Sequence, residues 1–486
     1  MTPAIEDVLL EDLLLNGSIA ALRQAFVDRH LSVGEAVAFY VARVEALDRS
    51  GPRLNAIRAL APDLEEQAQR ADAAIAEGLA LGPLHGIPVL LKDNIAAVGQ
   101  VMAAGAAALA GFKPQRDATL VTRLRNAGAI IFGKANMTEF ADYVSDVMPS
   151  GFSGAGGVVK NPHGFEYGRG LGSSIGPAAA VAAGLVPVAI GSETQNSIQT
   201  PACVSSLVGF KPSVGLVSRS GVVPLVTSQD SPGPLARSVA DAALVMSVIA
   251  GADIRDAASL ETSLTPPRAA VARDLRSIRL GVPRRTIADR ADIAALLPAF
   301  DKMLLRLAAA GVTIIDPCDA PSAEQLLDVR SSVFRTEFKA ALNAFLAEHG
   351  NPCGMTSLED IIRWNSAHPE AIPYGQSLLE AAQATSGLDD PQYRSDRLRD
   401  IALSRTAGID AALQFGNADA LIVPMSTAAK WTGKAGAPVL ALPIGLDETG
   451  LPFGVTLFSS CGQDQRLLDV GAALASLIGR RCLPSF

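Results

Sequence analysis

Serines in two turns of small and polar residues are the side chains of this sequence best placed to do chemistry. Ser173 and Ser174 stand between Gly172 and Gly176, and Ser197 stands in a second polar turn, 24 positions after Ser173. Glycines let a backbone turn tightly and approach other groups closely. A serine hydroxyl is a weak nucleophile until a neighbouring base takes its proton. The pattern therefore indicates serine chemistry that depends on a base supplied by another part of the chain.

The second turn, residues 191–197, directly follows an apolar run that is expected to be a buried strand. Backbone N–H groups become free where a strand ends in a turn, and successive free N–H groups can bind developing negative charge. An oxyanion hole works in this way. The turn places Thr194, Gln195 and Asn196 as candidates for such a site, with Ser197 at its end.

The run from Gly172 to Gly176 also matches the pattern G-x-S-x-G, which would make Ser174 the nucleophile of an α/β-hydrolase. That mechanism needs an acid and a histidine in addition to the serine. His349 and His368 are the possible histidines, and both lie in a region that is expected to be helical. The residues alone leave this alternative open.

Short β-rich runs, separated by glycine-rich turns or small-residue helices, must position these turns. Such alternation is typical of an α/β fold with a central sheet. Ser32 and Glu35 form a capping box that predicts a helix start, and a second helix is expected from about Asp63 to Glu77. Strands are expected at 87–91, 129–132, 186–190, 278–282, 312–315, 421–423, 439–442 and 453–458.

We expect one large α/β domain, residues 1–486, with a central mixed sheet flanked by helices. N-terminal helices would occupy about 15–80, and a catalytic core about 81–260. Charged and helical sequence from about 323 to 412 is expected to form a cover over the substrate pocket. Sheet-forming runs continue almost to the C-terminus, which favours one domain over several.

The composition argues against several classes of protein. Hydrophobic residues make up 49% and charged residues 19% of the 486 residues, which is typical of a globular protein. The net charge is −8 and no dense Lys/Arg block occurs, so no nucleic-acid partner is expected. Five scattered cysteines without a C-x-x-C pair, and histidines without ligand spacing, argue against disulfides and against a metal site.

The sequence also indicates a protein without a membrane anchor. Acidic residues interrupt the N-terminal segment, which is therefore unlike a secretory leader. The longest apolar run, 177–190, is shorter than the roughly 20 residues that a bilayer span needs. A cytoplasmic location is expected.

The segment 170–215 resembles the signature segment of the amidase signature family, including the spacing between Ser173 and Ser197. Further pieces resemble that family in the same order, so the resemblance covers about residues 15–480. They are HGIPVLLKDN at 85–94, GKANMTEF at 133–140, VGFKPSVGLVSRSGVVP at 208–224, SPGPLARSVADAA at 231–243 and APVLALPIGLDETGLPFGVTLF at 437–458.

The resemblance implies the amidase signature fold and three catalytic roles. Lys92 corresponds to the family's base, Ser173 to a relay serine that follows a cis peptide bond, and Ser197 to the nucleophile that forms an acyl-enzyme. The oxyanion would be held by N–H groups from Thr194 to Ser197, without a metal or an organic cofactor. Burial behind the apolar run 87–91 would keep Lys92 neutral, as a base must be.

The sequence departs from the family beside the nucleophile. Asn196 stands where glycine is usual, and Gln195 precedes it. Asn is the non-glycine residue best suited to positive φ, so we expect the turn to survive with two side chains near the oxyanion hole. Leu171 and Ile175 also stand where glycine is common in the family.

Among its relatives, the sequence looks closest to the peptide amidase branch. The expected function is hydrolysis of a C–N amide bond in a small molecule, releasing ammonia or an amine and an acid, by a monomer or homodimer. Carbamates, anilides, hydrazides or esters are alternative substrates for the same machinery. A glutamine-dependent amidotransferase subunit that acts with a partner on tRNA is a candidate of a different class. A non-catalytic binding relative is another.

Overall fold

Two neighbouring interior strands of a large mixed sheet carry the residues of interest. The computed structural model describes residues 5–164, 166–261, 264–288 and 290–486. Their strands are β1 Ile57–Leu60, β2 Pro88–Lys92, β3 Ile130–Ala135, β4 Phe152–Ser153, β5 Gly157–Val158, β6 Val188–Glu193, β7 Val208–Lys211, β8 Ser231–Ala236, β9 Arg279–Gly281, β10 Thr313–Ile315, β11 Ala420–Pro424, β12 Val439–Leu446 and β13 Pro452–Phe458. Eleven of these form one sheet in the order β1-β3-β2-β6-β8-β7-β12-β13-β11-β9-β10, and β4 pairs with β5.

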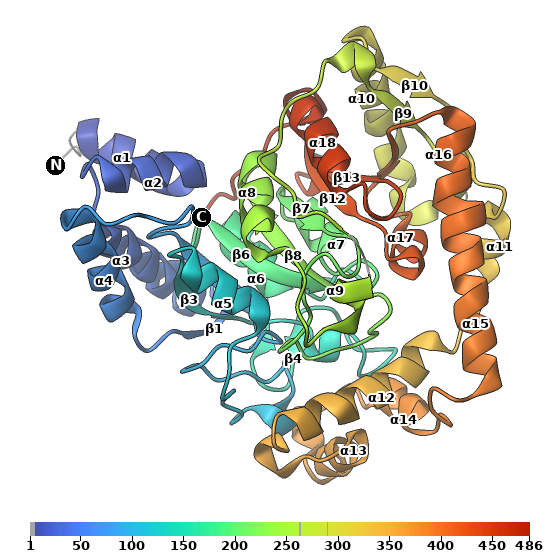
Figure 1. Ribbon diagram of the computed structural model, residues 1–486, viewed down its shortest axis with the longest axis horizontal. Helices are drawn as coiled ribbons and strands as arrows, with labels where there is room; N and C mark the ends of the chain where they lie inside the picture. The colour runs from blue at the N-terminus through green and yellow to red at the C-terminus, as the bar shows by residue number, and fades with distance from the viewer. Residues whose placement is uncertain (1–4, 165, 262–263, 289) are drawn as a thin grey trace.

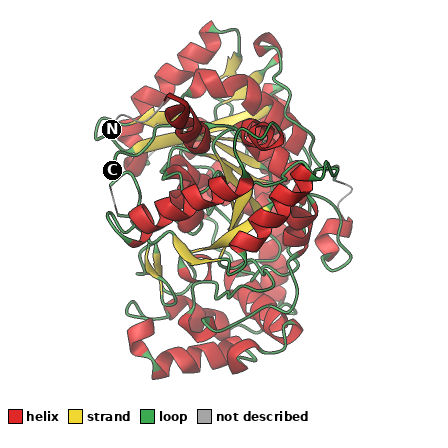
Figure 2. Cartoon of the chain, turned by 90° about the vertical axis from the view of Figure 1, so that its left-hand side faces the viewer, coloured by secondary structure: helices red, strands yellow, loops and turns green. Residues whose placement is uncertain are grey.

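Helices lie on both faces of this sheet, so the expected single α/β domain is confirmed (Figures 1 and 2). No helix in the described ranges is long and apolar enough to cross a bilayer. The N-terminal helices are α1 Ile5–Asn16, α2 Ile19–Val27, α3 Val33–Arg43 and α4 Leu64–Ala76. Those around the sheet are α5 Thr119–Asn126, α6 Ile175–Ala182, α7 Gln199–Cys203, α8 Val239–Ile249, α9 Ala257–Glu261, α10 Leu297–Ala309, α17 Ala429–Ala435 and α18 Asp464–Ile478.

The segment 323–412 is helical and lies along one side of the sheet, at the lower and right-hand edges of Figure 1. Charged residues dominate its exposed positions, whereas Phe338 and Leu342 are buried. Its helices are α11 Ala323–Asp328, α12 Val333–Glu348, α13 Leu358–Ala367, α14 Ser377–Gln383, α15 Pro391–Ile401 and the start of α16 Ala411–Gly416.

The register between β2 and β6 brings the chemistry-bearing segments together. The two strands are parallel, with Val89 opposite Val188 and Leu91 opposite Ile190. Parallel strands end at the same edge of a sheet. Lys92, the last residue of β2, therefore lies beside the residues that follow Ile190 in β6.

Three strands of the large sheet, β1, β7 and β8, were not expected from the sequence. β8 contains Pro232 and Pro234, and proline is normally confined to edge strands because it cannot donate a ladder hydrogen bond. β8 nevertheless lies between β6 and β7. Only Leu235 and Ala236 of β8 pair with β7, so both prolines lie outside that shorter ladder.

Local signals predicted the N-terminal helices well. Ser32 and Glu35 form the expected capping box at the start of α3, with reciprocal side-chain bonds to the backbone. The helix expected near 63–77 is α4. A strand, β1, lies between them and pairs with β3, so the N-terminal segment contributes to the sheet as well as to the helices.

Gly176 allows α6 to approach the sheet closely, and we expect Gly176→Ala to destabilise the fold. A Cβ atom at this position would lie 2.0 Å from the carbonyl oxygen of Asn136 and 2.7 Å from that of Ala56. Both are backbone atoms that cannot rotate away, so overpacking of about 1–3 kcal/mol is expected. The thermal unfolding midpoint should fall accordingly. Gly168→Ala is the matched control, because a Cβ there meets nothing within 4 Å; equal midpoints for the two variants would contradict this account.

Candidate active site

Lys92 ends β2 with its side chain enclosed among hydroxyl groups. Its Nζ lies 2.7 Å from Ser173 Oγ, 2.9 Å from Ser174 Oγ and 3.0 Å from both the carbonyl oxygen and Oγ of Ser192. Lys92, Ser173 and Ser174 are each 0% exposed. No carboxylate in the described residues forms an ion pair with Lys92. The surroundings therefore suit a neutral amine better than an ammonium ion.

Four oxygens lie within hydrogen-bond distance of Lys92 Nζ, and a neutral amine offers them two N–H donors and one lone pair. The carbonyl oxygen of Ser192 can only accept. Ser174 Oγ donates its own proton to that carbonyl oxygen at 3.0 Å, so it also accepts from Lys92. The amine can direct its two N–H groups to these acceptors and its lone pair to the hydroxyl of Ser173 or of Ser192, which lie 2.7 and 3.0 Å from Nζ.

The pKa of Lys92 is shifted in the direction that a base requires. Burial lowers this pKa to about 7, because an ammonium ion loses its hydration inside the protein. The negative charges of Asp230, Glu193 and Asp142 oppose the shift. A large fraction of Lys92 is therefore uncharged near neutral pH.

This shift predicts the pH dependence of the reaction. Protonated Lys92 has no lone pair, so kcat/KM for an amide substrate should fall as the pH drops below about 7 and level off above it. A pH profile of kcat/KM with a single amide measures this directly. A rate that stays constant through pH 7 would mean that Lys92 does not act as the base.

Asp230→Asn is expected to lower the pKa of Lys92. Asp230 makes the largest contribution among the charges that raise the pKa of Lys92. Its carboxylate accepts hydrogen bonds from Thr194 Oγ1 and from the N–H groups of Leu225 and Val226. Without the negative charge, the midpoint of the pH profile should move to lower pH. A shift to higher pH would contradict the assignment of this midpoint to Lys92.

Ser150 and Thr138 hold the backbone of residues 171–173. The peptide bond between Gly172 and Ser173 is cis, as the resemblance implied. The N–H groups of Leu171 and Gly172 donate to Ser150 Oγ at 3.1 and 3.0 Å. The N–H of Thr138 donates to the carbonyl oxygen of Ser173 at 3.2 Å. These contacts fix the backbone on both sides of the cis bond.

Ser197 lies in the turn between β6 and α7, close to the other two expected residues. Its carbonyl oxygen accepts the N–H of Ser174 at 3.1 Å, which ties the two serine turns together. Within the part of the chain that the structure describes, its hydroxyl makes no hydrogen bond to Ser173 or any other group, and the residue is buried at 4% exposure.

The turn that ends at Ser197 has the free N–H groups expected of an oxyanion hole. Among described residues, no protein acceptor takes the backbone N–H of Thr194, Gln195, Asn196 or Ser197. We expected positive φ at Asn196, but its φ is not positive. Its side chain also turns away from the N–H groups, because Nδ2 donates to the carbonyl oxygen of Gly170 at 2.7 Å.

The sequence did not point to Glu193, whose buried carboxylate holds the residues that follow Ser197. Its Oε2 accepts the N–H groups of Ile198 and Gln199 at 2.7 and 2.9 Å, and its Oε1 accepts Gln199 Nε2 at 2.7 Å. These are the residues directly after Ser197. Sequence reasoning also missed the contact of Ser192 with Lys92. That contact follows from the pairing of β2 with β6, which places both residues at one edge of the sheet.

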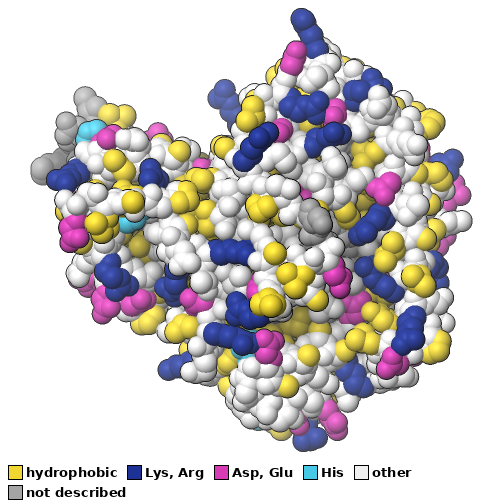
Figure 3. All heavy atoms as spheres, in the orientation of Figure 1, with side chains coloured by type: hydrophobic (Ala, Val, Ile, Leu, Met, Phe, Trp, Pro, Cys, Tyr) yellow, Lys and Arg dark blue, Asp and Glu magenta, His cyan; other side chains and the backbone are white. Residues whose placement is uncertain are grey.

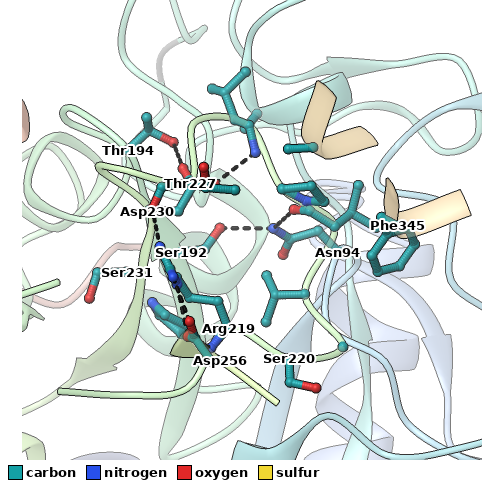
Figure 4. A pocket seen from close by; sticks show the side chains of 18 of the residues that line it. Asn94, Ser192, Thr194, Arg219, Ser220, Thr227, Asp230, Ser231, Asp256 and Phe345 are labelled. Atoms are coloured by element: carbon teal, nitrogen blue, oxygen red, sulfur yellow. Dashed lines mark hydrogen bonds and ion pairs between the residues drawn. The ribbon is translucent and has the colours of Figure 1, made fainter. Parts of the chain in front are cut away.

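A cavity of about 200 Å³ opens beside this cluster (Figure 4). Ser192 lines it while contacting Lys92, and Asn94 Nδ2 donates to Ser192 Oγ at 2.9 Å. The close-up also shows the bond between Thr194 and Asp230. The residues that line the cavity include Asn94, Ser192, Thr194, Arg219, Asp230, Asp256 and, from α12, Ala341, Ala344 and Phe345. Helix α12 therefore forms part of the cavity beside the serine turns.

The α/β-hydrolase alternative finds no support in these contacts. Ser174 bonds to Lys92 and to the backbone of Ser192, and no histidine in the described ranges bonds to it. His368 stacks on Trp364 with ring centroids 4.0 Å apart and bonds to the Trp364 carbonyl oxygen. The described part of the chain therefore supplies no histidine that could activate Ser174.

Comparison with known proteins relates this arrangement to one family. The model of the Amidase family matches residues 35–435. The chain is 33% identical to a probable amidase from Arabidopsis thaliana, over 100% of this chain and 93% of the relative. It is 32% identical to a glutamyl-tRNA(Gln) amidotransferase subunit from Symbiobacterium thermophilum, over 94% and 96% of the two chains.

Two solved structures resemble the whole fold. Native peptide amidase from Stenotrophomonas maltophilia has a TM-score of 0.88 and 37% identity, covering 96% of this chain and 98% of that one. An amidase family protein from Bacillus anthracis has a TM-score of 0.90 and 29% identity, covering 100% and 95%. The chain belongs to the amidase family, and it is an amide-hydrolysing enzyme.

Proposed function

We propose that Ser197 is the nucleophile, Ser173 the proton relay and Lys92 the base of this amidase. The observation that carries the proposal is the distance of 2.7 Å between Lys92 Nζ and Ser173 Oγ, inside a fully buried cluster where no carboxylate of the described residues pairs with the amine. Ser197 lies next to this pair, at the end of a turn with free N–H groups.

In the acylation step, Ser197 Oγ attacks the carbonyl carbon of the amide. Its proton passes to Ser173 Oγ while the proton of Ser173 passes to Lys92 Nζ, so a neutral amine becomes an ammonium ion. The N–H groups of Thr194, Gln195 and Asn196, with that of Ser197, bind the negative oxygen that forms. The C–N bond then breaks as the relay returns a proton to the leaving nitrogen.

The second half of the reaction uses the same path. Water attacks the acyl-enzyme and gives its proton through Ser173 to Lys92. The tetrahedral species collapses, the C–O bond to Ser197 breaks, and Ser197 recovers its proton. The products are a carboxylic acid and ammonia or an amine, and the relay needs neither a metal nor an organic cofactor.

The substrate is a small linear amide. The cavity of about 200 Å³ is lined by Ser192 and Thr194, the neighbours of the proposed catalytic residues, and not by Lys92, Ser173 or Ser197 themselves; its size is below that of a drug-sized ligand pocket, which favours a small substrate. The likeness to peptide amidase favours a primary amide whose leaving group is ammonia. Carbamates, anilides, hydrazides and esters differ mainly in their leaving group, and the same relay can serve them.

A second candidate function is that of an amidotransferase subunit, which the likeness to a glutamyl-tRNA(Gln) amidotransferase subunit favours. Such a subunit would hydrolyse glutamine for the benefit of a partner protein. The purified chain should be incubated with glutamine and with a small primary amide. Hydrolysis of the small amide in the absence of a partner would favour the free-standing amidase.

A free-standing enzyme also fits the charges on the surface. On the face shown in Figure 3, basic and acidic side chains are interspersed and form no continuous basic stripe for nucleic acid. The net charge of −8 points the same way. We infer a cytoplasmic monomer or homodimer that acts on small molecules without a nucleic-acid or membrane partner.

Labelling with a serine-directed fluorophosphonate tests the nucleophile. Wild type, Ser197→Ala and Lys92→Ala should be treated in parallel, and the adduct located by peptide mass spectrometry. We expect an adduct on Ser197 in the wild type, none in Ser197→Ala and much slower labelling in Lys92→Ala. An adduct on Ser174, or no adduct at all, would refute the proposed mechanism.

A further inference from the structure

We propose that the side chain of Asn196 positions the relay serine, Ser173, by holding the loop that precedes it. The proposal rests on the function proposed above, in which Ser173 carries a proton between Ser197 and Lys92. Asn196 Nδ2 donates to the carbonyl oxygen of Gly170 at 2.7 Å, across 26 positions of sequence. The residue before the nucleophile thereby contacts the segment that leads to the relay.

The two serine turns are joined at two points, one on each side of Ser173. After Ser173, the N–H of Ser174 donates to the carbonyl oxygen of Ser197 at 3.1 Å. Before it, the Asn196 amide holds Gly170. The relay serine therefore lies on a short stretch of chain whose two ends are both tied to the nucleophile turn.

Packing does not hold the Gly170 end of this stretch. Gly168, Arg169 and Gly170 are exposed, and a Cβ at Gly168 or Gly170 would meet nothing within 4 Å. Ser150 Oγ anchors the next two N–H groups but lies on the buried side of the loop. The bond from Asn196 therefore ties the exposed side of this loop to the nucleophile turn.

The contact requires a hydrogen-bond donor on the side chain of residue 196. Glycine at position 196 would leave the Gly170 carbonyl oxygen without this donor. Aspartate would keep the shape of asparagine, but its ionised carboxylate has no proton to donate and would repel the carbonyl oxygen. Asparagine at this position therefore adds a link that a glycine in the same turn cannot make.

The expected effect falls on the chemical step, because the loop carries a proton relay. A small displacement of a relay group lowers the rate of proton transfer much more than substrate affinity. We expect Asn196→Ala and Asn196→Gly to lower kcat about tenfold, and Asn196→Asp to lower it further, while KM changes less than about twofold. The rate of fluorophosphonate labelling at Ser197 should fall in parallel with kcat.

The test compares these variants with wild type in kcat, KM, labelling rate and thermal unfolding midpoint. Asn196→Gln, which keeps a donor on a longer side chain, should recover part of the lost kcat. Glu166→Ala, in the exposed part of the same loop, is the matched control and should retain wild-type kcat.

The outcomes separate this inference from the proposed function. Wild-type kcat in Asn196→Asp, or a loss of kcat that only follows a fall in the unfolding midpoint, would overturn the positioning role. If Ser197→Ala abolishes activity while Asn196→Asp retains it, only the role of Asn196 fails. If Ser197→Ala remains active, the proposed function itself fails.

Discussion

Replacing Ser197 with alanine is expected to lower kcat by about 10⁴-fold or more. The loss should be this large because the Ser197 oxygen is the atom that bonds to the substrate carbon in the proposed mechanism, and no neighbouring group can substitute for it. Residual hydrolysis would come from binding and from the free N–H groups of the turn. Steady-state hydrolysis of a small primary amide by the purified variant measures the effect.

Ser174→Ala is the comparison that makes this prediction specific. Ser174 also contacts Lys92, at 2.9 Å, but it directs its proton to the carbonyl oxygen of Ser192. Its loss should reduce kcat less than the loss of Ser197, because it supports the base without bonding to substrate. A larger loss in Ser174→Ala than in Ser197→Ala would exchange the roles of the two serines and contradict the mechanism.

Replacing Lys92 with methionine is expected to lower kcat about 10³-fold or more at neutral pH, with little effect on KM. Methionine fills nearly the same buried space with an apolar, flexible chain but has no amine to accept the relayed proton. The remaining activity should also lose the pH midpoint near 7. The measurements are kcat and KM across the neutral pH range, with circular dichroism to confirm the fold.

A second buried lysine supplies the matched control. Lys134 in β3 is 0% exposed, and burial lowers its pKa to about 7 as well. Its Nζ bonds to the carbonyl oxygen of Ile95 and contacts none of the three serines around Lys92. Lys134→Met should therefore keep the midpoint of the pH profile. If Lys134→Met removes the midpoint and Lys92→Met retains it, the base has been assigned to the wrong lysine.

The fold class was predictable because its signals are local. Apolar runs bounded by glycine-rich turns predicted most strands of the sheet, and the capping box of Ser32 and Glu35 marked the start of α3. β8 was missed because Pro232 and Pro234 contradict the usual composition of a central strand. β8 can lie inside the sheet because β7 pairs only with Leu235 and Ala236, and the length of that pairing is a property of the assembled sheet.

The candidate site was predictable as a set of residues but not as a set of contacts. The resemblance named Lys92, Ser173 and Ser197, and the structure brings all three segments together. Their catalytic roles remain predictions until the variants are measured. The contacts of Ser192 with Lys92 and of Asn196 with Gly170 join residues at least 26 positions apart. Such pairs follow from strand register and loop geometry, which spacing along the chain does not reveal.

The tight packing around the two serine turns has a consequence for directed evolution of this enzyme. A Cβ at Gly191 would lie 2.8 Å from Ser174 Oγ, and one at Gly233 would lie 2.0 Å from the carbonyl oxygen of Phe210. Random mutagenesis across this region will therefore yield mostly inactive or unfolded clones. Ala341 and Ala344 of α12, by contrast, line the cavity with small side chains from outside the sheet. A library confined to these α12 positions will sample new substrate shapes while the hydrolytic groups keep their geometry.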